Sequence, residues 1–337
     1  MPRNIESANQ LLDQIDRLHS APQVVQKVLQ LTRTPDFNIL EVVACIEKDP
    51  ALAARILKVV NSSQYGLRHQ LSSVRQAASY IGQRSLNLIA LTFGLVDTLT
   101  RGVNAELYHR YWARALGMAS AASHLSTKRD DVLCDKAYTA GLLADIGMLV
   151  FAQIHGDRYS TISQALPHGS ELIDAEELEF GIGHPDLGAH LLQRWGVPDE
   201  LVSAIETHHA DKSPGDPLAT TVHAANLTAE AILTPDSLHV RVAQSLVLTE
   251  FDIDTDGFID LALTCQDEIN QSAADFGVSL DHPIDCQQLL QEAQQRFAEA
   301  SLETAMEFDS LTSAFEDCSL VGQSRVDCSE NDFDSLS

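Results

Sequence analysis

Apolar residues recur every three or four positions through most of residues 20–100, which is the period of a helix that buries one face. Asp49 is a suitable N-cap and Pro50 a suitable first helical residue, while Asn61 and Gly82 are suitable helix ends. The pattern therefore predicts a succession of short helices. Their sequences are APQVVQKVLQLT (21–32), NILEVVACIEK (38–48), DPALAARILKVVN (49–61), LSSVRQAASYIG (71–82) and SLNLIALTFGLVDTL (85–99).

Residues 105–250 continue the helical pattern, with loops predicted where glycine and proline gather in HGDR, PHGS, GIGHPD and DKSPGDP. Two further amphipathic helices are expected at about 256–276 and 285–306. No run of alternating β-branched residues indicates a strand. Past residue 307 the apolar content is low, which predicts a tail. The residues expected in the core are Val24, Ile56, Leu57, Ile81, Leu88, Ile89, Leu142, Leu143, Ile146 and Leu191.

The composition agrees with an all-α protein, because 45% of the 337 residues are apolar and only 6% are aromatic. The six cysteines form no CxxC pair, so neither a zinc site nor a disulfide framework is predicted. The N-terminus is polar, and the most apolar run, LNLIALTFGLV (86–96), is shorter than the roughly 20 residues of a membrane span. We therefore expect a cytoplasmic protein without membrane insertion.

The formal net charge is −26, and most of the excess lies in the last quarter of the chain. From Glu250 onward there are 21 Asp and Glu residues against two arginines, Arg296 and Arg325. A field of this sign repels phosphate backbones, which makes nucleic acid an unfavourable partner for the protein as a whole. The acidic C-terminal extension is interpreted as a solvating segment.

Two stretches, AGLLADIGMLVF (140–151) and EFGIGHPDLGAHLLQRWGVPDELVSAIETHHA (179–210), resemble the HDOD family, a bacterial branch of the HD-domain superfamily. Residues 18–31, 46–66 and 71–91 resemble the first half of such domains, so the similarity covers about residues 17–230. The resemblance implies an all-α, two-lobed helical bundle that serves in signal transduction rather than catalysis. We expect an N-terminal helical lobe at 1–103, an HD-like lobe at 104–250, C-terminal helices at 251–307 and an acidic tail at 308–337.

The resemblance also implies where the superfamily's metal ligands fall. Hydrolases with HD domains hold divalent metals through histidine and aspartate, which suit such ions. Here three of the positions have lost their donor, because they are occupied by Arg114, Ala144 and Asn226. The positions that keep their donor are Asp145, His184, His208 and His209.

Arg114 occupies a position where the superfamily has a metal-binding histidine, and the arginine changes the chemistry of the site more than the loss of the histidine alone would. A guanidinium cannot deprotonate and cannot bind a metal. The hypothesis is that an Arg114–Asp145 ion pair replaces the metal, so that no cofactor is predicted. Neighbours on a helix point about 100° apart, and we therefore expect that His208 and His209 do not easily face one site together. A structural role is the first interpretation of the surviving histidines; the alternatives are a single metal held by Asp145, His184 and His208 or His209, or contact with a ligand.

Two other stretches of the sequence resemble known binding motifs, but each departs from its motif. DIDTDGFIDLAL (252–263) resembles a calcium-binding loop but has Leu263 where a bidentate glutamate is needed, so Thr255 or Asp256 as a helix N-cap is favoured. Residues 74–91 resemble a helix-turn-helix whose second helix is too apolar for a DNA groove. Basic residues near it are candidates for binding an anion such as a nucleotide: Lys48, Arg55, Lys58, Arg68, Arg75 and Arg84.

The sequence thus predicts a non-catalytic bacterial regulatory module that acts by binding. The expected partners are signalling proteins, among them sensors or enzymes of cyclic-nucleotide turnover, or a small nucleotide. A degenerate metal-dependent phosphohydrolase and a nucleic-acid binder acting through residues 74–91 are the alternatives.

Overall fold

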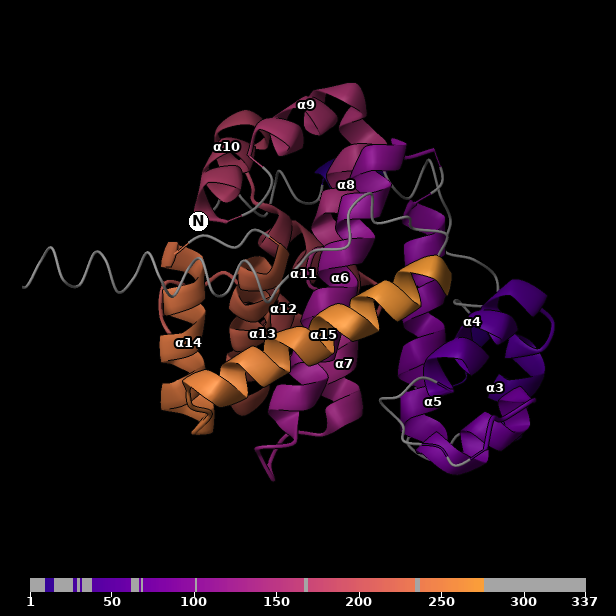
Figure 1. Cartoon of the computed structure of the whole chain (residues 1–337). Helices are drawn as coiled ribbons and strands as arrows, with labels where there is room; N and C mark the ends of the chain where they lie inside the picture. Colours follow the sequence, from indigo (N-terminus) through magenta and orange to yellow (C-terminus); the bar gives the residue numbers. More distant parts are fainter. Residues whose placement is uncertain are drawn as a thin grey trace, which may run out of the picture. The chain divides into compact units, whose positions relative to one another are not determined.

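The computed structural model describes residues 10–14, 27–28, 31, 38–61, 67, 69–100, 102–166, 169–233 and 237–275. All regular elements in these ranges are helices, which confirms the all-α fold (Figure 1). They are α3 (Ile39–Ile46), α4 (Pro50–Val60), α5 (Val74–Leu99), α6 (Ala105–Ser126), α7 (Cys134–Leu143), α8 (Ile146–His155), α9 (Asp157–Ala165), α10 (Ser170–Phe180), α11 (His184–Arg194), α12 (Asp199–Glu206), α13 (Pro217–Leu233), α14 (Ser237–Phe251) and α15 (Thr255–Asp275).

The first described helices start and stop where the sequence predicts. The carboxylate of Asp49 accepts a hydrogen bond from the Leu52 amide at 3.1 Å, so Asp49 caps α4. The side chain of Asn61 follows α4 and bonds both the amide and the carbonyl of Leu71. Gly82 interrupts α5 with φ 82° and ψ 169°, a conformation that a residue with a Cβ rarely adopts. The sequence prediction of a helix end at Gly82 is confirmed, because α5 is two helices that meet at this glycine.

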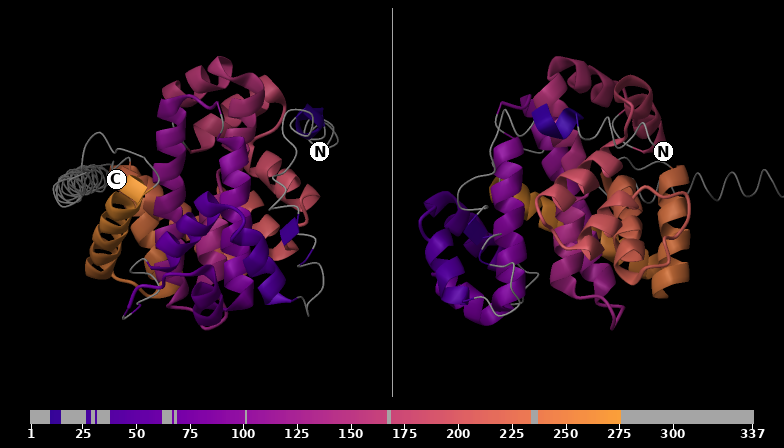
Figure 2. Two further views of the ribbon diagram at one scale, coloured as in Figure 1. Left: turned by 90° about the vertical axis from the view of Figure 1, so that its right-hand side faces the viewer. Right: turned by 180° about the vertical axis from the view of Figure 1, so that it is seen from behind.

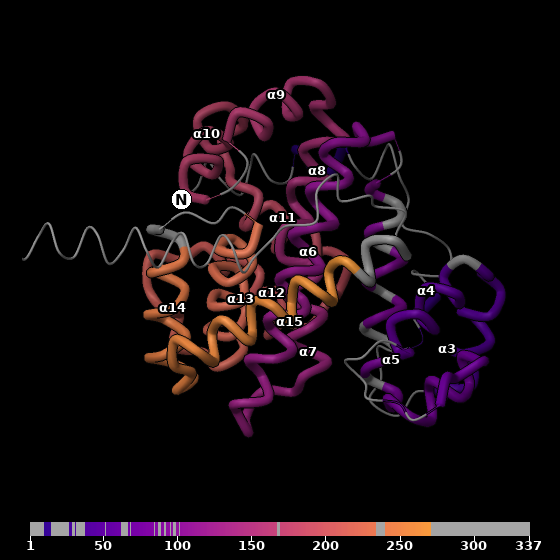
Figure 3. The backbone as a smooth tube through the Cα atoms, viewed as in Figure 1, coloured from indigo at the N-terminus to yellow at the C-terminus, as the bar shows by residue number. Residues whose placement is uncertain are grey.

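Helix α6 is the central helix of the part of the chain that follows α5. It is buried along most of its length and packs against α7, α13 and α15. In Figure 1, α15 crosses α6 on the outside of the bundle, and Figure 2 shows the same helices from two further sides. The N-terminal helices α3 and α4 pack on α5, which contacts α7 and α8. The Cα trace in Figure 3 follows the same order of helices.

Most of the expected core residues that the structure describes are buried, namely Ile56, Ile89, Leu142, Leu143, Ile146 and Leu191. Leu57 and Ile81 are half-buried, so for these two the expectation is wrong. Both lie on helices with solvent on one side, where a residue at the edge of the apolar stripe stays partly exposed. Val24 and the side chain of Leu88 lie outside the described residues, as do the predicted helix at 285–306 and most of the one at 21–32.

Helix α15 begins at Thr255, one residue earlier than a Thr255 cap would allow and two residues earlier than an Asp256 cap would allow. The Asp254 carboxylate accepts a hydrogen bond from the Gly257 amide at 2.9 Å, so Asp254 is the N-cap. Two compact units are recognised, Met1–Cys286 and Gln287–Ser337, and every described residue lies in the first. The predicted division at residues 103, 250 and 307 stays a prediction.

One helical stretch, Cys134–His155, is long and apolar enough to cross a membrane by length and composition. However, 89% of its apolar window is buried inside the protein. This is the behaviour of a core segment, and the stretch in fact consists of the two short helices α7 and α8.

Candidate functional site: a buried arginine, aspartate and histidine cluster

Asp145 lies at the break between α7 and α8 and is fully buried. The break lets the carboxylate point into the bundle instead of along a helix surface. Gly147, two residues later, allows the start of α11 to approach closely, because a Cβ at this glycine would lie 2.0 Å from the carbonyl oxygen of His184. The sequence D-x-G therefore places Asp145 and His184 side by side, although they are distant in the chain.

Arg114 reaches Asp145 from the middle of α6. Its Nε donates a hydrogen bond to Asp145 Oδ2 at 2.7 Å, and its Nη2 donates one to Asn226 Oδ1 at 2.7 Å. Only 4% of the arginine is exposed. The expected Arg114–Asp145 ion pair therefore forms, and Asn226 on α13 accepts from the same guanidinium. These bonds join α6, α13 and the α7–α8 break.

His184 opens α11 and is held between two carboxylates. Its backbone amide and its Nδ1 donate to Glu176 Oε2 at 2.7 and 2.8 Å. Its Nε2 lies 3.5 Å from Asp145 Oδ1, close enough for an ion pair, but makes no hydrogen bond. The second oxygen of Glu176 accepts a bond from the Tyr159 hydroxyl at 2.7 Å. Glu176 thus fixes the orientation of the imidazole, which makes it a second carboxylate of the site.

The sequence analysis did not include Glu176. A signal for it was present, because Leu172, Glu176 and Phe180 follow one another at intervals of four and so share a face of α10. A carboxylate between two apolar residues on one face is expected to be buried and to have a partner. In the structure Leu172 and Glu176 are both fully buried.

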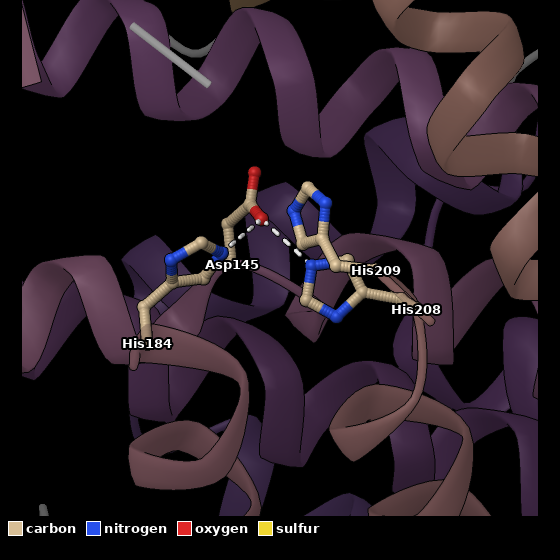
Figure 4. Close-up of side chains that lie close together, drawn as sticks. All are labelled: Asp145, His184, His208 and His209. Carbon is tan, nitrogen blue, oxygen red and sulfur yellow. Dashed lines mark hydrogen bonds and ion pairs between the residues drawn. The ribbon is translucent and has the colours of Figure 1, made fainter. Parts of the chain in front are cut away.

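His208 and His209 both lie at the site, and here the prediction from helical geometry was wrong. They belong to a turn that follows α12, not to a helix, so their side chains are not fixed about 100° apart. His208 Nδ1 donates to the Ile205 carbonyl at 2.6 Å, and its Nε2 lies 3.2 Å from Asp145 Oδ1. His209 Nδ1 lies 3.3 Å from Asn226 Nδ2. Figure 4 shows both rings close to the Asp145 carboxylate.

Burial and neighbouring charges act together on the acids and bases of this cluster. Burial alone would raise the pKa of Asp145, but the Arg114 guanidinium and the two histidines outweigh it and hold that pKa well below its usual range. Burial would lower the pKa of His184, yet the carboxylates of Glu176 and Asp145 raise it to about 9. Burial and nearby positive charge lower the pKa of His209 well below its usual value. His184 is therefore the imidazole that carries a charge at neutral pH.

Four donors of the cluster could hold a single metal ion. One ligand atom each from Asp145, His184, His208 and His209 lies within 4.8 Å of the others. The Nδ1 atoms of His184 and His208 donate to acceptors, so in their neutral forms both rings present a bare Nε2 to Asp145 Oδ1. His209 differs, because its Nδ1 accepts from Asn226 and its neutral form keeps the proton on Nε2.

Two further histidines of the described residues make backbone hydrogen bonds, and the described candidates for anion binding lie on or next to α3, α4 and α5. His190 Nδ1 bonds the Asp186 carbonyl and His223 Nδ1 bonds the His208 carbonyl, as expected for structural histidines. Ala144 is buried beside Asp145 and contributes no donor. Of the anion-binding candidates, Lys48 follows α3, Arg55 and Lys58 lie on α4, and Arg75 lies in the first turn of α5; Arg68 and the side chain of Arg84 lie outside the described residues. Anion binding by this set stays a prediction.

An all-α bundle with aspartate and histidine at its helix breaks defines an HD-like class of protein. The model of the HDOD domain matches residues 18–211, which is more than half of the chain. The chain therefore belongs to the HDOD domain family. In general terms this makes it a regulatory module.

Solved structures share the fold. A candidate phosphohydrolase from Shewanella amazonensis SB2B is similar with a TM-score of 0.60 at 21% identity, over 77% of this chain and 97% of that one. An HDOD domain protein of unknown function from Geobacter sulfurreducens has a TM-score of 0.59 at 23% identity, over 83% and 98%. A candidate signal-transduction protein from Marinobacter aquaeolei VT8 has a TM-score of 0.58 at 25% identity, over 78% and 60%.

Curated relatives are longer than this chain. An uncharacterised protein of Treponema pallidum (strain Nichols) is 29% identical over 268 residues, covering 73% of this chain and 50% of that protein. The ribonuclease Y of Fervidobacterium nodosum is 32% identical over 96 residues, covering 28% of this chain and 17% of the ribonuclease. The chain thus spans at most half the length of these two relatives.

Proposed function

We propose that this chain is a non-catalytic module that regulates by binding, and that Arg114 replaces a metal ion in its HD-like site. The observation that carries the proposal is the buried guanidinium, which bonds both Asp145 and Asn226 at 2.7 Å. Because the guanidinium stays charged, it opposes a dication. Two like unit charges about 4 Å apart repel each other by roughly 4 kcal/mol at an effective dielectric near 20.

The burial of the cluster supports the same proposal. Asp145 and His208 have no exposed surface, and 1% of His184 is exposed. Catalysis on a phosphoester needs the substrate within hydrogen-bond reach of the catalytic groups. In the described conformation a substrate cannot reach them. We infer that regulation is exerted on signalling proteins in the cytoplasm, with sensors and enzymes of cyclic-nucleotide turnover as the first candidates, or through a small nucleotide.

A hydrolysis assay tests the proposal. The protein is incubated with Mn²⁺ and bis(p-nitrophenyl) phosphate, and release of nitrophenol is compared with that of the Asp145→Ala variant. We expect equal, background rates from both. Metal-dependent release that disappears in Asp145→Ala would show that the site is catalytic and would overturn the proposal.

A second candidate function is a phosphohydrolase with one metal ion, and the four converging donors favour it. Asp145 Oδ1 and the Nε2 atoms of His184 and His208 fit one divalent ion, while Arg114 keeps the other oxygen of Asp145. A bound ion would act as a Lewis acid and lower the pKa of a bound water. Elemental analysis of protein purified without chelators distinguishes the two candidates. Near-stoichiometric iron, manganese or zinc that is lost in Asp145→Asn supports the second.

A further inference from the structure

Helices α9 and α10 form a pair that joins the rest of the bundle mainly through α8. Helix α10 packs mainly against α9, and α9 mainly against α8. Figures 1 and 3 show the two helices together at the top of the helical bundle, above α11. Such a pair can move as a unit once its side-chain contacts with α6, α8 and α11 are broken.

The contacts that hold this pair in place differ along its length. At one end, the ring of Phe180 stacks on His155 with centroids 4.3 Å apart and lies 4.9 Å from Phe151. At the other end, Arg110 on α6 donates to the backbone and side chain of Ser163. Between them, Glu176 receives the two hydrogen bonds from His184. Of these contacts, the one made by Glu176 leads directly to the buried site.

We propose that the α9–α10 pair is a gate over the Asp145 site, and that Glu176 is the latch that holds it closed. Asp145 and His208 are fully buried, so a solute reaches them only when a covering segment moves away, whereas the neighbouring His209 is partly exposed. Glu176 joins the covering helix to His184, the first residue of α11, through both the backbone and the ring. The gate concerns access to the site, and it holds whether or not the site hydrolyses a substrate.

The substitution Glu176→Gln tests the latch with little change in shape. Glutamine has a single acceptor oxygen, which cannot serve both the Tyr159 hydroxyl and the two N–H groups of His184. The neutral amide attracts the charged His184 ring less strongly than the carboxylate does, and the Tyr159 hydroxyl would have to turn from donor to acceptor to face the amide N–H group. We therefore expect the pair to separate from α11 more often in this variant. Glu179→Gln is the matched control, because Glu179 pairs with Arg158 within the same two helices and does not contact His184.

Access is measured by the rate at which diethyl pyrocarbonate modifies individual histidines at neutral pH, followed by peptide mass spectrometry. Buried His208 reports on the site, and exposed His69 is the internal reference. In the wild type we expect His208 to react far more slowly than His69. Glu176→Gln should raise the rate at His208 about tenfold or more, because the charged acceptor of the His184 hydrogen bonds becomes a neutral one. Glu179→Gln should leave the rates unchanged.

Amide hydrogen exchange on the same proteins separates a gate from general unfolding. If the gate exists, Glu176→Gln loses protection in α9 and α10 while α6 and α13 keep theirs. Unchanged histidine rates in Glu176→Gln overturn the proposal. Faster rates that accompany an equal loss of protection in α6 and α13 also overturn it, because Glu176 would then support the whole bundle. Neither result depends on the hydrolysis assay, so the gate and the proposed function can fail independently.

Discussion

Arg114 brings a permanent charge into the interior, and the cluster is built to neutralise it. Asp145 and Asn226 accept hydrogen bonds from two of its nitrogen atoms, Nε and Nη2, while Nη1 is buried without a hydrogen-bond partner. Removing one partner of a buried pair leaves the other charge uncompensated, which costs more than the pair itself contributes. For Arg114→Met we therefore expect a loss of about 3–5 kcal/mol in the free energy of unfolding, measured by urea denaturation.

The control for this prediction is the double variant Arg114→Met/Asp145→Asn. Without the arginine, the single variant keeps a buried carboxylate that burial would push toward protonation. Converting it to an amide removes that charge, so the double variant should recover part of the lost stability. A double variant that is less stable than Arg114→Met by the full cost of Asp145→Asn alone would contradict the coupling between the two residues.

His184 gives the stability a pH dependence of defined sign. Its pKa is raised from 6.5 to about 9 because Glu176 and Asp145 outweigh the effect of burial. A raised folded-state pKa stabilises the protein fully below the unfolded value, and this stabilisation is lost as pH rises from 6.5 through 9. A shift of this size corresponds to about 3 kcal/mol. Unfolding free energies measured by urea from pH 6 to 9.5 should fall, whereas the slope should be much smaller in His184→Gln.

At the scale of single residues, the sequence could predict the ion pair but not the whole cluster. The Arg114–Asp145 ion pair could be predicted because both residues occupy metal-ligand positions of the same site and carry opposite charges. His209 was misplaced because the prediction assumed a helix at a position where the chain turns. Glu176 was missed because its partner, His184, is eight residues away and in another helix, so no short motif contains both.

Among the elements, the crossing of α8 and α11 depends on Gly147. A Cβ there would lie 2.0 Å from the carbonyl oxygen of His184, and backbone cannot yield as a side chain can. We expect Gly147→Ala to lower the melting temperature strongly, at a cost above the 1–3 kcal/mol that is typical of overpacking. The measurement is thermal unfolding followed by circular dichroism.

Gly117→Ala is the matched control for this prediction. Its added Cβ would lie 3.3 Å from the Cβ of Ala229, which is close but involves a side chain. Alanine also has the higher helix propensity, by about 1 kcal/mol. The expected change is therefore small for Gly117→Ala. Similar losses in the two variants would contradict the view that the α8–α11 crossing is the tighter contact.

Helix ends could be predicted where one residue type alone marks the end, and were missed where several neighbours could serve. Asp49, Asn61 and Gly82 were recognised because capping and chain reversal depend on the local residue type. The cap of α15 is Asp254 instead of the predicted Thr255 or Asp256. In DTDG several residues have side chains that can accept the same bond, and the choice among them depends on how α15 packs on α6.

For the whole molecule, net charge and burial both argue against the alternative that the protein binds nucleic acid through residues 74–91. The chain carries a formal charge of −26, which repels phosphate at long range. The second half of α5, which would be the recognition helix, has Leu86 and Phe93 fully buried, so this face cannot enter a DNA groove. Basic residues such as Lys58 and Arg75 remain on the surface. They are the groups through which any binding would occur.

We therefore expect no shift of a random DNA duplex in a gel at low salt, the condition under which contacts to phosphate are strongest. The assay is most informative when a basic DNA-binding protein serves as the positive control in the same buffer. A shift that weakens as salt is added, and that is reduced by Lys58→Ala and Arg75→Ala, would contradict the prediction. Because neither lysine nor arginine there contacts the Asp145 cluster, such a result would add a second surface without changing the interpretation of the buried site.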